Sequence, residues 1–138
     1  MTRREAREQA FVIIFERMFN KETLFEIIEN AVEGRSLEID DFARKLAEQS
    51  IIHEDGTNEI IDRLSKKWKI NRMPKTTVAI LKIALCEIDY FDDIPESVTV
   101  NEAVEIAKKY AGAEDASYIN GILGAYIKEK TGNNLISE

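Results

Sequence analysis

The first residues whose type and spacing could do chemistry are arginines at the start of the chain. Arg3, Arg4 and Arg7 would lie together within the first two turns of a helix, because residues three and four apart share a helix face. Guanidinium groups bind phosphates and stack on bases, so one interpretation is an anion-binding patch. The alternative is that Arg4 pairs with Glu8 and the other arginines are simply solvated. From charge alone, this alternative is favoured.

A second cluster, both polar and aromatic, lies closer to the end of the chain. It comprises Lys108, Lys109 and Tyr110, followed by Asp115 and Tyr118. Aromatic rings near lysines can stack unpaired bases, but a tyrosine at a helix end is more often partly buried structure. In isolation, the cluster is weak evidence for nucleic-acid binding.

The sequence gives little support for catalysis or metal binding. It contains no glycine-rich phosphate loop, nucleophile elbow or HExxH pattern. The only cysteine, Cys86, lies in an apolar run and is far in sequence from the only histidine, His53. A thiol–histidine pair or a zinc site built from several such residues is therefore not expected. We predict a protein that is not an enzyme, with no cofactor and no metal.

Composition limits the remaining function classes. The 138 residues are 44% hydrophobic and carry a net charge of −7, whereas a general polyanion binder is usually basic. Any nucleic-acid role must therefore depend on a local patch. No apolar run approaches the roughly 18 residues of a membrane span, and the basic start lacks the apolar core of a signal peptide. We expect a single cytoplasmic domain with no membrane association.

Apolar spacing predicts helices throughout and no strand. The segment from Thr76 to Phe91 is apolar nearly all round, which is typical of a helix buried on several sides. Three Thr-x-x-Glu capping boxes and an Asp N-cap mark helix starts, and six further helices are predicted: Arg3–Phe19, 23–34, 38–53, 60–68, one from Thr99 to about 111, and one from Asp115 to about 132. Seven helices with short links predict an all-α fold, either one compact antiparallel bundle or two small bundles packed together.

Two glycines inside the last predicted helix are unusual. Gly121 and Gly124 each cost a helix about 1 kcal/mol relative to alanine. Close packing of another helix or backbone would explain them. On that interpretation, Gly121→Leu should destabilise the fold through a packing clash.

Taken together, these segments resemble the NusB family of bacterial transcription antitermination factors, almost from end to end. The resemblance is carried by three blocks: residues 3–10; Trp68 and Arg72 with residues 80–84 and Glu87; and Ile94-Pro95 with residues 100–110 and 118–123. It implies an all-helical fold of two packed sub-bundles, about 1–70 and 74–138. It also implies binding to single-stranded boxA RNA of ribosomal RNA transcripts together with the small-subunit ribosomal protein NusE. Other Nus factors and RNA polymerase would be reached indirectly.

The resemblance also implies roles for individual positions. RNA contacts are expected from Arg3, Arg4, Arg7, Lys82, Lys108, Asp115 and Tyr118, and partner contacts from Phe15 and Thr77. Under the resemblance, the arginine cluster changes from a solvated helix start to a functional surface.

Two alternatives remain open. One is a helical module that acts only through protein contacts or as a homodimer covering the arginine face, which the acidic charge would suit. The other is the form of this domain that precedes the catalytic part of some ribosomal RNA cytosine methyltransferases. That form would need a methyltransferase segment absent from these 138 residues.

Overall fold

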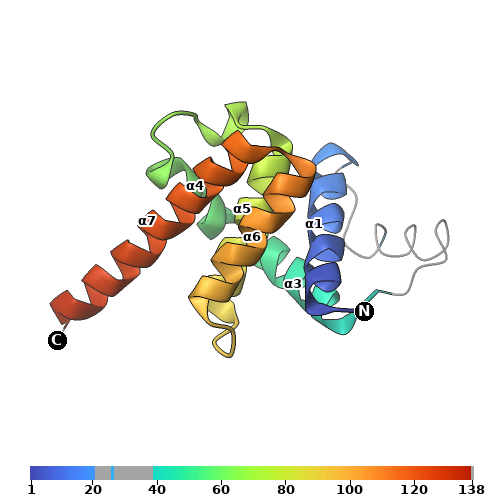
Figure 1. Cartoon of the computed structure of the whole chain (residues 1–138), viewed down its shortest axis with the longest axis horizontal. Coiled ribbons are helices and arrows are strands. Elements are labelled where there is room, and N and C mark those ends of the chain that lie inside the picture. The colour runs from blue at the N-terminus through green and yellow to red at the C-terminus, as the bar shows by residue number, and fades with distance from the viewer. Residues whose placement is uncertain (21–25, 27–38, 138) are drawn as a thin grey trace.

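The computed structural model describes residues 1–20, 26 and 39–137, and this part of the chain is helical with no strand. Its elements, labelled as in Figure 1, are α1 (Arg3–Asn20), α3 (Asp41–Ile52), α4 (Glu54–Leu64), the 3₁₀ helix η1 (Ile70–Arg72), α5 (Lys75–Tyr90), α6 (Glu96–Tyr110) and α7 (Ala113–Ser137). The predicted all-α class is confirmed. The helix predicted over 23–34 lies outside the described residues, and the division into two bundles stays a prediction.

Helix α5 is the centre of the fold, as predicted. Every residue from Thr77 to Ile88 is buried, and the helix contacts α1, α3, α4, α6 and α7. Figure 1 shows α6 crossing in front of α5, with α1 to one side and α7 running away from the body. Because α5 is buried nearly all round, its few polar side chains must find partners inside the protein.

Polar side chains at the starts of α1 and α3 accept hydrogen bonds from backbone amides. In the predicted capping box, the Thr2 amide donates to Glu5 Oε1 at 3.0 Å and the Glu5 amide donates to Thr2 Oγ1 at 3.1 Å. Asp40 caps α3 by accepting from the amides of Phe42 and Ala43. Helix α3 therefore begins at Asp41 and not near residue 38.

The break between the helices predicted over 38–53 and 60–68 is a single residue, His53. His53 has a non-helical φ of −101° and separates α3 from α4. Gly56 lies inside the first turn of α4, so it does not interrupt the helix. Helix α4 ends at Leu64, which leaves Trp68 in the connection before η1.

The capping box predicted at Thr99 and Glu102 is wrong. Helix α6 begins at Glu96, directly after Pro95, whose φ of −60° already suits a helix start. Thr99 is therefore inside the helix, where its hydroxyl donates to Glu87. A Thr-x-x-Glu pattern also arises when both residues lie within a helix and point to different tertiary partners.

The N-cap predicted at Asp115 is also wrong. Helix α6 is followed by Gly112, where φ is +125°, a backbone conformation that favours glycine. The amides of Ala111 and Gly112 both donate to the Ala107 carbonyl at 2.8 Å, as at many glycine-terminated helices. Helix α7 then begins at once at Ala113, and it continues to Ser137, beyond the predicted end near 132.

The glycines of α7 do not mark close packing. Within the described part of the chain, a Cβ built at Gly121 or Gly124 would have no atom within 4 Å, and both residues are exposed. The expectation that Gly121→Leu clashes is therefore wrong. The helical cost of these glycines has no packing explanation.

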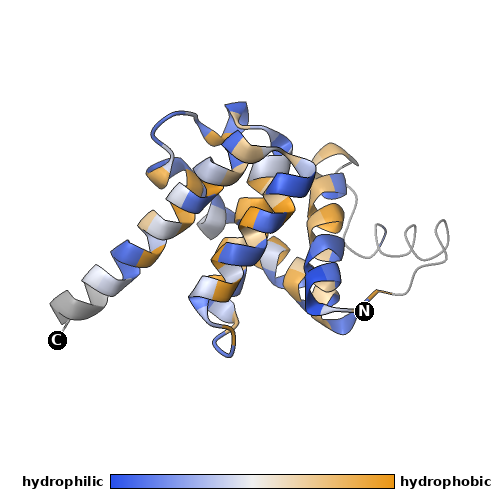
Figure 2. Cartoon of the chain, viewed as in Figure 1, coloured by the Kyte–Doolittle hydropathy of each residue, from blue (hydrophilic) through white to orange (hydrophobic). Residues whose placement is uncertain are grey.

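Hydropathy divides α1 along its length. Figure 2 shows its first turns mainly hydrophilic and its last turns mainly hydrophobic. One end of α1 is therefore suited to charged ligands and the other to an apolar partner.

Two buried threonines on helices α5 and α6 give opposite predictions for the same substitution. Thr99 Oγ1 donates to Glu87 at 3.0 Å, whereas Thr77 Oγ1 is buried with no hydrogen-bond partner among the described residues. Replacing threonine with valine keeps the shape and removes the hydroxyl. We expect Thr99→Val to lower the free energy of unfolding by about 1–3 kcal/mol, because Glu87 loses a donor, and Thr77→Val to leave it unchanged or raise it. Urea unfolding of the two variants tests this, and equal losses would contradict it.

Candidate nucleic-acid interface

One arginine of the first cluster, Arg4, and two lysines of the second, Lys108 and Lys109, meet on one surface of the folded protein. Residues from α1 and α6 line a shallow hollow of about 320 Å³. We call this the α1–α6 surface, and its lining residues are Arg4, Glu8, Glu105, Ile106, Lys108 and Lys109. Cations far apart in sequence are thus brought together, which spacing within either cluster did not indicate.

Arg4 is held at the edge of this surface by α6. Its Nε and Nη2 donate to the two carboxylate oxygens of Glu102 at 2.8 and 3.0 Å. The hydrogen bond to Glu102 raises the pKa of Arg4, and the same bond lowers the pKa of Glu102. Arg4 therefore pairs with Glu102 and not with Glu8. Its side chain remains 54% exposed, so one edge of the guanidinium is open to a ligand.

Glu8 instead receives hydrogen bonds from the end of α6. Lys109 Nζ donates to it at 2.9 Å and the Tyr110 hydroxyl at 3.2 Å. The Tyr110 ring packs on Phe11, with centroids 5.0 Å apart, and stays 40% exposed. The contact with Glu8 raises the pKa of Lys109.

The α1–α6 surface is rich in charge but locally balanced. Its cations Arg4, Lys108 and Lys109 alternate with the carboxylates of Glu8, Glu102 and Glu105, and Lys108 Nζ lies 3.5 Å from Glu105. A phosphate can bind there only by displacing a carboxylate from a cation, or by sharing the cation with it.

Arg3 points to another neighbour. Its guanidinium carbon lies 4.0 Å from the centroid of the Phe42 ring on α3, a cation–π arrangement. Arg3 is exposed. Stacking on a ring uses the flat face of the guanidinium, so the N–H groups in its plane can still donate to a ligand.

Arg7 is not part of the exposed set. It is 5% exposed, and its Nε and Nη2 donate to Glu87 at 3.0 and 2.6 Å. Glu87 also accepts from Thr99. This network, which we call the Glu87 cluster, joins α1, α5 and α6. RNA could contact the Arg7 guanidinium only after an ion pair buried in the core had opened.

Two other predicted site residues, Lys82 and Thr77, are also inside the protein, and a third, Phe15, is partly so. Lys82 is 6% exposed and donates to Glu54 at 2.9 Å, and Glu54 also pairs with Arg17 at 3.0 Å. Burial by itself would raise the pKa of Glu54, but these two cations outweigh it and lower that pKa. Thr77 is fully buried, and Phe15 is half-buried.

Sequence reasoning missed Phe19, the exposed aromatic residue near the predicted partner positions. Phe11 stacks on Phe15 with ring centroids 5.8 Å apart, and Phe15 meets Phe19 edge to face with centroids 4.9 Å apart. Phe19 is 56% exposed, and Lys75 Nζ lies 5.6 Å from the centroid of its ring. The spacing of four residues was visible in the sequence, but which aromatic remained exposed was not.

Asp115 and Tyr118 lie in a second hollow, of about 550 Å³, between the α4–η1 connection and α7. We call it the Trp68 groove. Its lining residues are Leu64, Lys66, Lys67, Trp68, Glu114, Asp115, Ser117, Tyr118, Gly121, Ile122 and Ala125. The Trp68 and Tyr118 rings meet edge to face at 5.3 Å, and the Tyr118 hydroxyl hydrogen-bonds Ser65.

Comparison with known proteins shows which family the chain belongs to. The NusB family model matches residues 4–128. The chain belongs to the NusB family. A transcription antitermination protein NusB from Clostridium novyi is 36% identical over 93% of this chain and 99% of its own length, and one from Acetivibrio thermocellus is 38% identical over 94% and 91%.

Solved NusB structures share the fold. T. maritima NusB superposes with a TM-score of 0.80 at 31% identity, covering 94% of this chain and 92% of that one. A crystal structure of the antitermination factors NusB and NusE with double-stranded RNA gives a TM-score of 0.81 at 23% identity, covering 94% and 99%. At that identity the second match shows the fold alone.

The described part of this NusB-family chain offers no metal centre, because no three His, Cys, Asp or Glu side chains in it are grouped to hold an ion. Burial raises the pKa of the Cys86 thiol to about 11, so Cys86 is not a ready nucleophile. None of the described helices is both long and apolar enough to span a membrane.

The different settings of Arg7 and Arg4 predict different effects on stability. Arg7→Ala leaves Glu87 buried without its cation, and we expect the free energy of unfolding to fall by about 3–5 kcal/mol. Arg4→Ala removes an exposed contact and should leave stability nearly unchanged. Urea unfolding measures both. Similar losses in the two variants would show that the buried pair has no special role.

Proposed function

We propose that this chain is a non-enzymatic transcription antitermination factor that binds single-stranded boxA RNA of ribosomal RNA transcripts together with NusE. The observation that carries this proposal is the convergence of Arg4, Lys108 and Lys109 on one surface in a member of the NusB family. In this role it would work in the cytoplasm and reach other Nus factors and RNA polymerase through the assembled RNA complex.

RNA binding would proceed by exchange of anions on the α1–α6 surface. A phosphate approaching Arg4 takes over hydrogen bonds now made to Glu102 at 2.8 and 3.0 Å. A second phosphate can do the same at Lys109, which now contacts Glu8. The carboxylates hold the cations in extended positions before RNA arrives, so less side-chain entropy is lost on binding. Arg3, stacked on Phe42, supplies a further cation nearby.

Arg7 would support this surface without touching RNA. Its contacts with Glu87 fix the rotation of α1 against α5 and α6. That rotation determines that Arg4 faces α6 while Arg3 faces Phe42. Lys82, paired with Glu54 in the interior, would likewise have a structural role.

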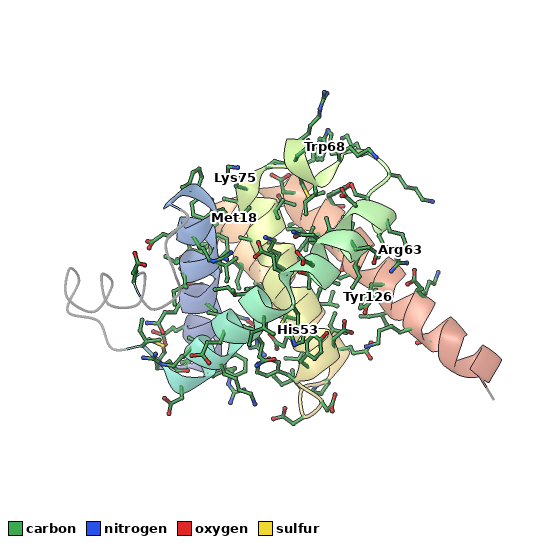
Figure 3. All side chains as sticks on the ribbon, turned by 180° about the vertical axis from the view of Figure 1, so that it is seen from behind. Met18, His53, Arg63, Trp68, Lys75 and Tyr126 are labelled. Atoms are coloured by element: carbon green, nitrogen blue, oxygen red, sulfur yellow. The ribbon has the colours of Figure 1, made fainter. Side chains whose placement is uncertain are left out.

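NusE would dock on a separate surface at the end of α1, which we call the Phe19 face. The exposed Phe19 ring lies next to the half-buried Phe15 and close to Lys75. Met18 and Lys75, which lie near each other in Figure 3, line a hollow of about 220 Å³. Asn58 also lines it, and its Oδ1 is buried with no hydrogen-bond partner in the described part of the chain. A NusB of this fold has been crystallised with NusE and RNA, which supports the pairing.

Two separate surfaces suit an adaptor. Each contact can be weak alone, because RNA and NusE held together raise the effective concentration of the second contact. No contact among the described residues favours either of the two alternatives, a module that binds only proteins or the form that precedes a methyltransferase. Failure of RNA binding in the experiment below would favour the first.

The exposed arginines should carry the electrostatic part of RNA binding. We expect Arg3→Ala with Arg4→Ala to weaken binding to a boxA-like RNA and to reduce the salt slope by about 0.7 for each phosphate that the arginines had neutralised. Fluorescence anisotropy over a salt series, with and without NusE and against a scrambled RNA, measures both quantities.

The matched control is Arg63→Ala. Arg63 lies on α4, beside the middle of α7 in Figure 3. It is 41% exposed and pairs with Glu59 and Glu129. The Arg63→Ala variant should leave the salt slope unchanged. An equal loss in the control would mean that overall charge, and not the α1–α6 surface, governs binding.

The Phe19 face gives a separate prediction. Phe19→Ala should weaken NusE binding about tenfold or more, as expected for an exposed aromatic anchor, and leave RNA binding by the chain alone unchanged. Ile52→Ala is the control, because Ile52 is 67% exposed on α3. Isothermal titration with NusE compares them, and equal affinities would place the docking site elsewhere.

A further inference from the structure

Ser65 joins three parts of the structure, and its hydroxyl makes most of the contacts. The residue directly follows α4, and its amide donates to the Ile61 carbonyl at 2.8 Å, so its backbone closes that helix. Its Oγ hydrogen-bonds the carbonyl and the amide of Trp68, which lies on the connection to η1. The same oxygen hydrogen-bonds the hydroxyl of Tyr118 on α7. We call this set of three bonds the Ser65 bridge.

The number of available protons fixes the direction of each bond in the Ser65 bridge. A serine hydroxyl has one proton to donate and two lone pairs with which to accept. The Trp68 carbonyl can only accept, so Ser65 donates its proton there. The Trp68 amide, at 3.4 Å, and the Tyr118 hydroxyl are then the two donors to Ser65. The hydrogen-bonding capacity of Ser65 is therefore fully used, and the only proton of the Tyr118 hydroxyl is committed to it.

The Ser65 bridge is one of two anchors of the connection between α4 and η1, residues 65–69. At the far end of this connection, Asp62 Oδ1 accepts from the Ile70 amide at 2.8 Å. Trp68 lies between the two anchors, at the outer edge of the molecule in Figure 3. A short connection tied in this way holds the backbone of Trp68 in one position.

The same bridge ties the connection to α7. The Trp68 and Tyr118 rings meet edge to face with centroids 5.3 Å apart, and the Ser65 hydroxyl fixes the outer end of the Tyr118 ring. Lys67 also reaches α7, where its Nζ lies 3.8 Å from Glu114. Both of those side chains are well exposed, so their ion pair contributes little. The angle between the two rings therefore depends mainly on Ser65.

We propose that Ser65 is a positioning residue for RNA binding, whose hydroxyl fixes the Trp68 and Tyr118 rings relative to each other before RNA arrives. This inference rests on the proposed function and on Tyr118 as an RNA contact that the family resemblance predicts. A side chain that is already held loses less conformational entropy when a ligand binds. Because the Tyr118 proton is donated to Ser65, Tyr118 offers RNA its ring and an oxygen lone pair, but no hydrogen-bond donor.

The first test compares Ser65→Ala with Ser50→Ala. Both substitutions remove one hydroxyl, but the Ser50 hydroxyl donates to the Leu46 carbonyl within α3 and does not reach α7. We expect Ser65→Ala to weaken binding of a boxA-like RNA about 2- to 10-fold, the equivalent of one hydrogen bond. Ser50→Ala should bind as the unmodified chain does. Fluorescence anisotropy of labelled RNA, with NusE present, measures both affinities, and urea unfolding shows that both variants are folded.

A conservative variant separates the hydroxyl from the rest of the side chain. Ser65→Thr keeps the hydroxyl, and the extended backbone at this residue, with φ −79° and ψ 111°, suits a β-branched side chain. We expect Ser65→Thr to restore the RNA affinity that Ser65→Ala loses. A loss that the threonine does not repair would contradict a role for the hydroxyl.

The bond between Ser65 and Tyr118 can also be removed from the other side. Tyr118→Phe keeps the ring and deletes the hydroxyl, so it breaks the bridge without changing Ser65. We expect it to weaken RNA binding about 2- to 10-fold in the unmodified chain and to have no further effect in the Ser65→Ala variant. Equal effects in the two backgrounds would show that the hydroxyls act independently, which would overturn the proposal.

Trp68 reports the positioning directly, because it is the only tryptophan in the chain. We expect the fluorescence anisotropy of Trp68 to be lower in free Ser65→Ala than in the free unmodified chain, since the ring is held less firmly. At saturating RNA the two proteins should give the same anisotropy. A loss of fold stability alone would not produce this difference in fully folded protein.

The outcomes separate this inference from the proposed function. If the unmodified chain binds no RNA even with NusE, the proposed function fails and the inference fails with it. If Arg3→Ala with Arg4→Ala weakens RNA binding but Ser65→Ala binds as Ser50→Ala does, the inference alone is overturned. It is also overturned if Ser65→Ala weakens RNA binding while the anisotropy of free Trp68 stays unchanged.

Discussion

A single buried carboxylate, Glu87, holds the helices of the α1–α6 surface in place. It lies on α5 and accepts hydrogen bonds from Arg7 of α1 and Thr99 of α6. A carboxylate at 1% exposure is tolerated only with such partners. Because the two donors and their acceptor must meet at one point, the hydrogen bonds of Glu87 favour the observed rotation of α1 and α6 on α5. That rotation brings Arg4 beside Glu102 and Glu8 beside Lys109.

The same constraint shows how an acidic protein can present a surface for a polyanion. The net charge of −7 repels RNA at long range, so attraction must arise at short range. On the α1–α6 surface each exposed cation is already extended toward a carboxylate, such as Lys109 toward Glu8 at 2.9 Å. A phosphate that replaces the carboxylate leaves an acidic side chain to be solvated. Part of the gain is therefore cancelled, which favours moderate affinity and dependence on a second partner.

The helical class, the central position of α5 and the Thr2–Glu5 capping box could be predicted from the sequence, because each depends on residues close together in the chain. The role of Arg7 could not, since its partner Glu87 is 80 residues away. The sequence around Thr99 is compatible both with a capping box and with a position inside α6. The sequence showed that Gly121 is unfavourable in a helix, but not whether a neighbour packs against it or the space beside it is open. In each case the missing information was tertiary.

The turn at Gly112 determines how the predicted RNA-contact positions on α6 and α7 are related. Lys109 and Tyr110 end α6 on one side of it, and Glu114 and Asp115 begin α7 on the other. Lys109 and Glu114 are about five residues apart along the chain, so their Cα atoms are at most about 18 Å apart. The φ of +125° at Gly112 lets α7 start at once. The chain that connects the α1–α6 surface to the Trp68 groove is therefore short. An RNA strand bound on the first surface would therefore have only a short distance to cover before it reached Asp115 and Tyr118, the RNA-contact positions that the resemblance predicts in the second.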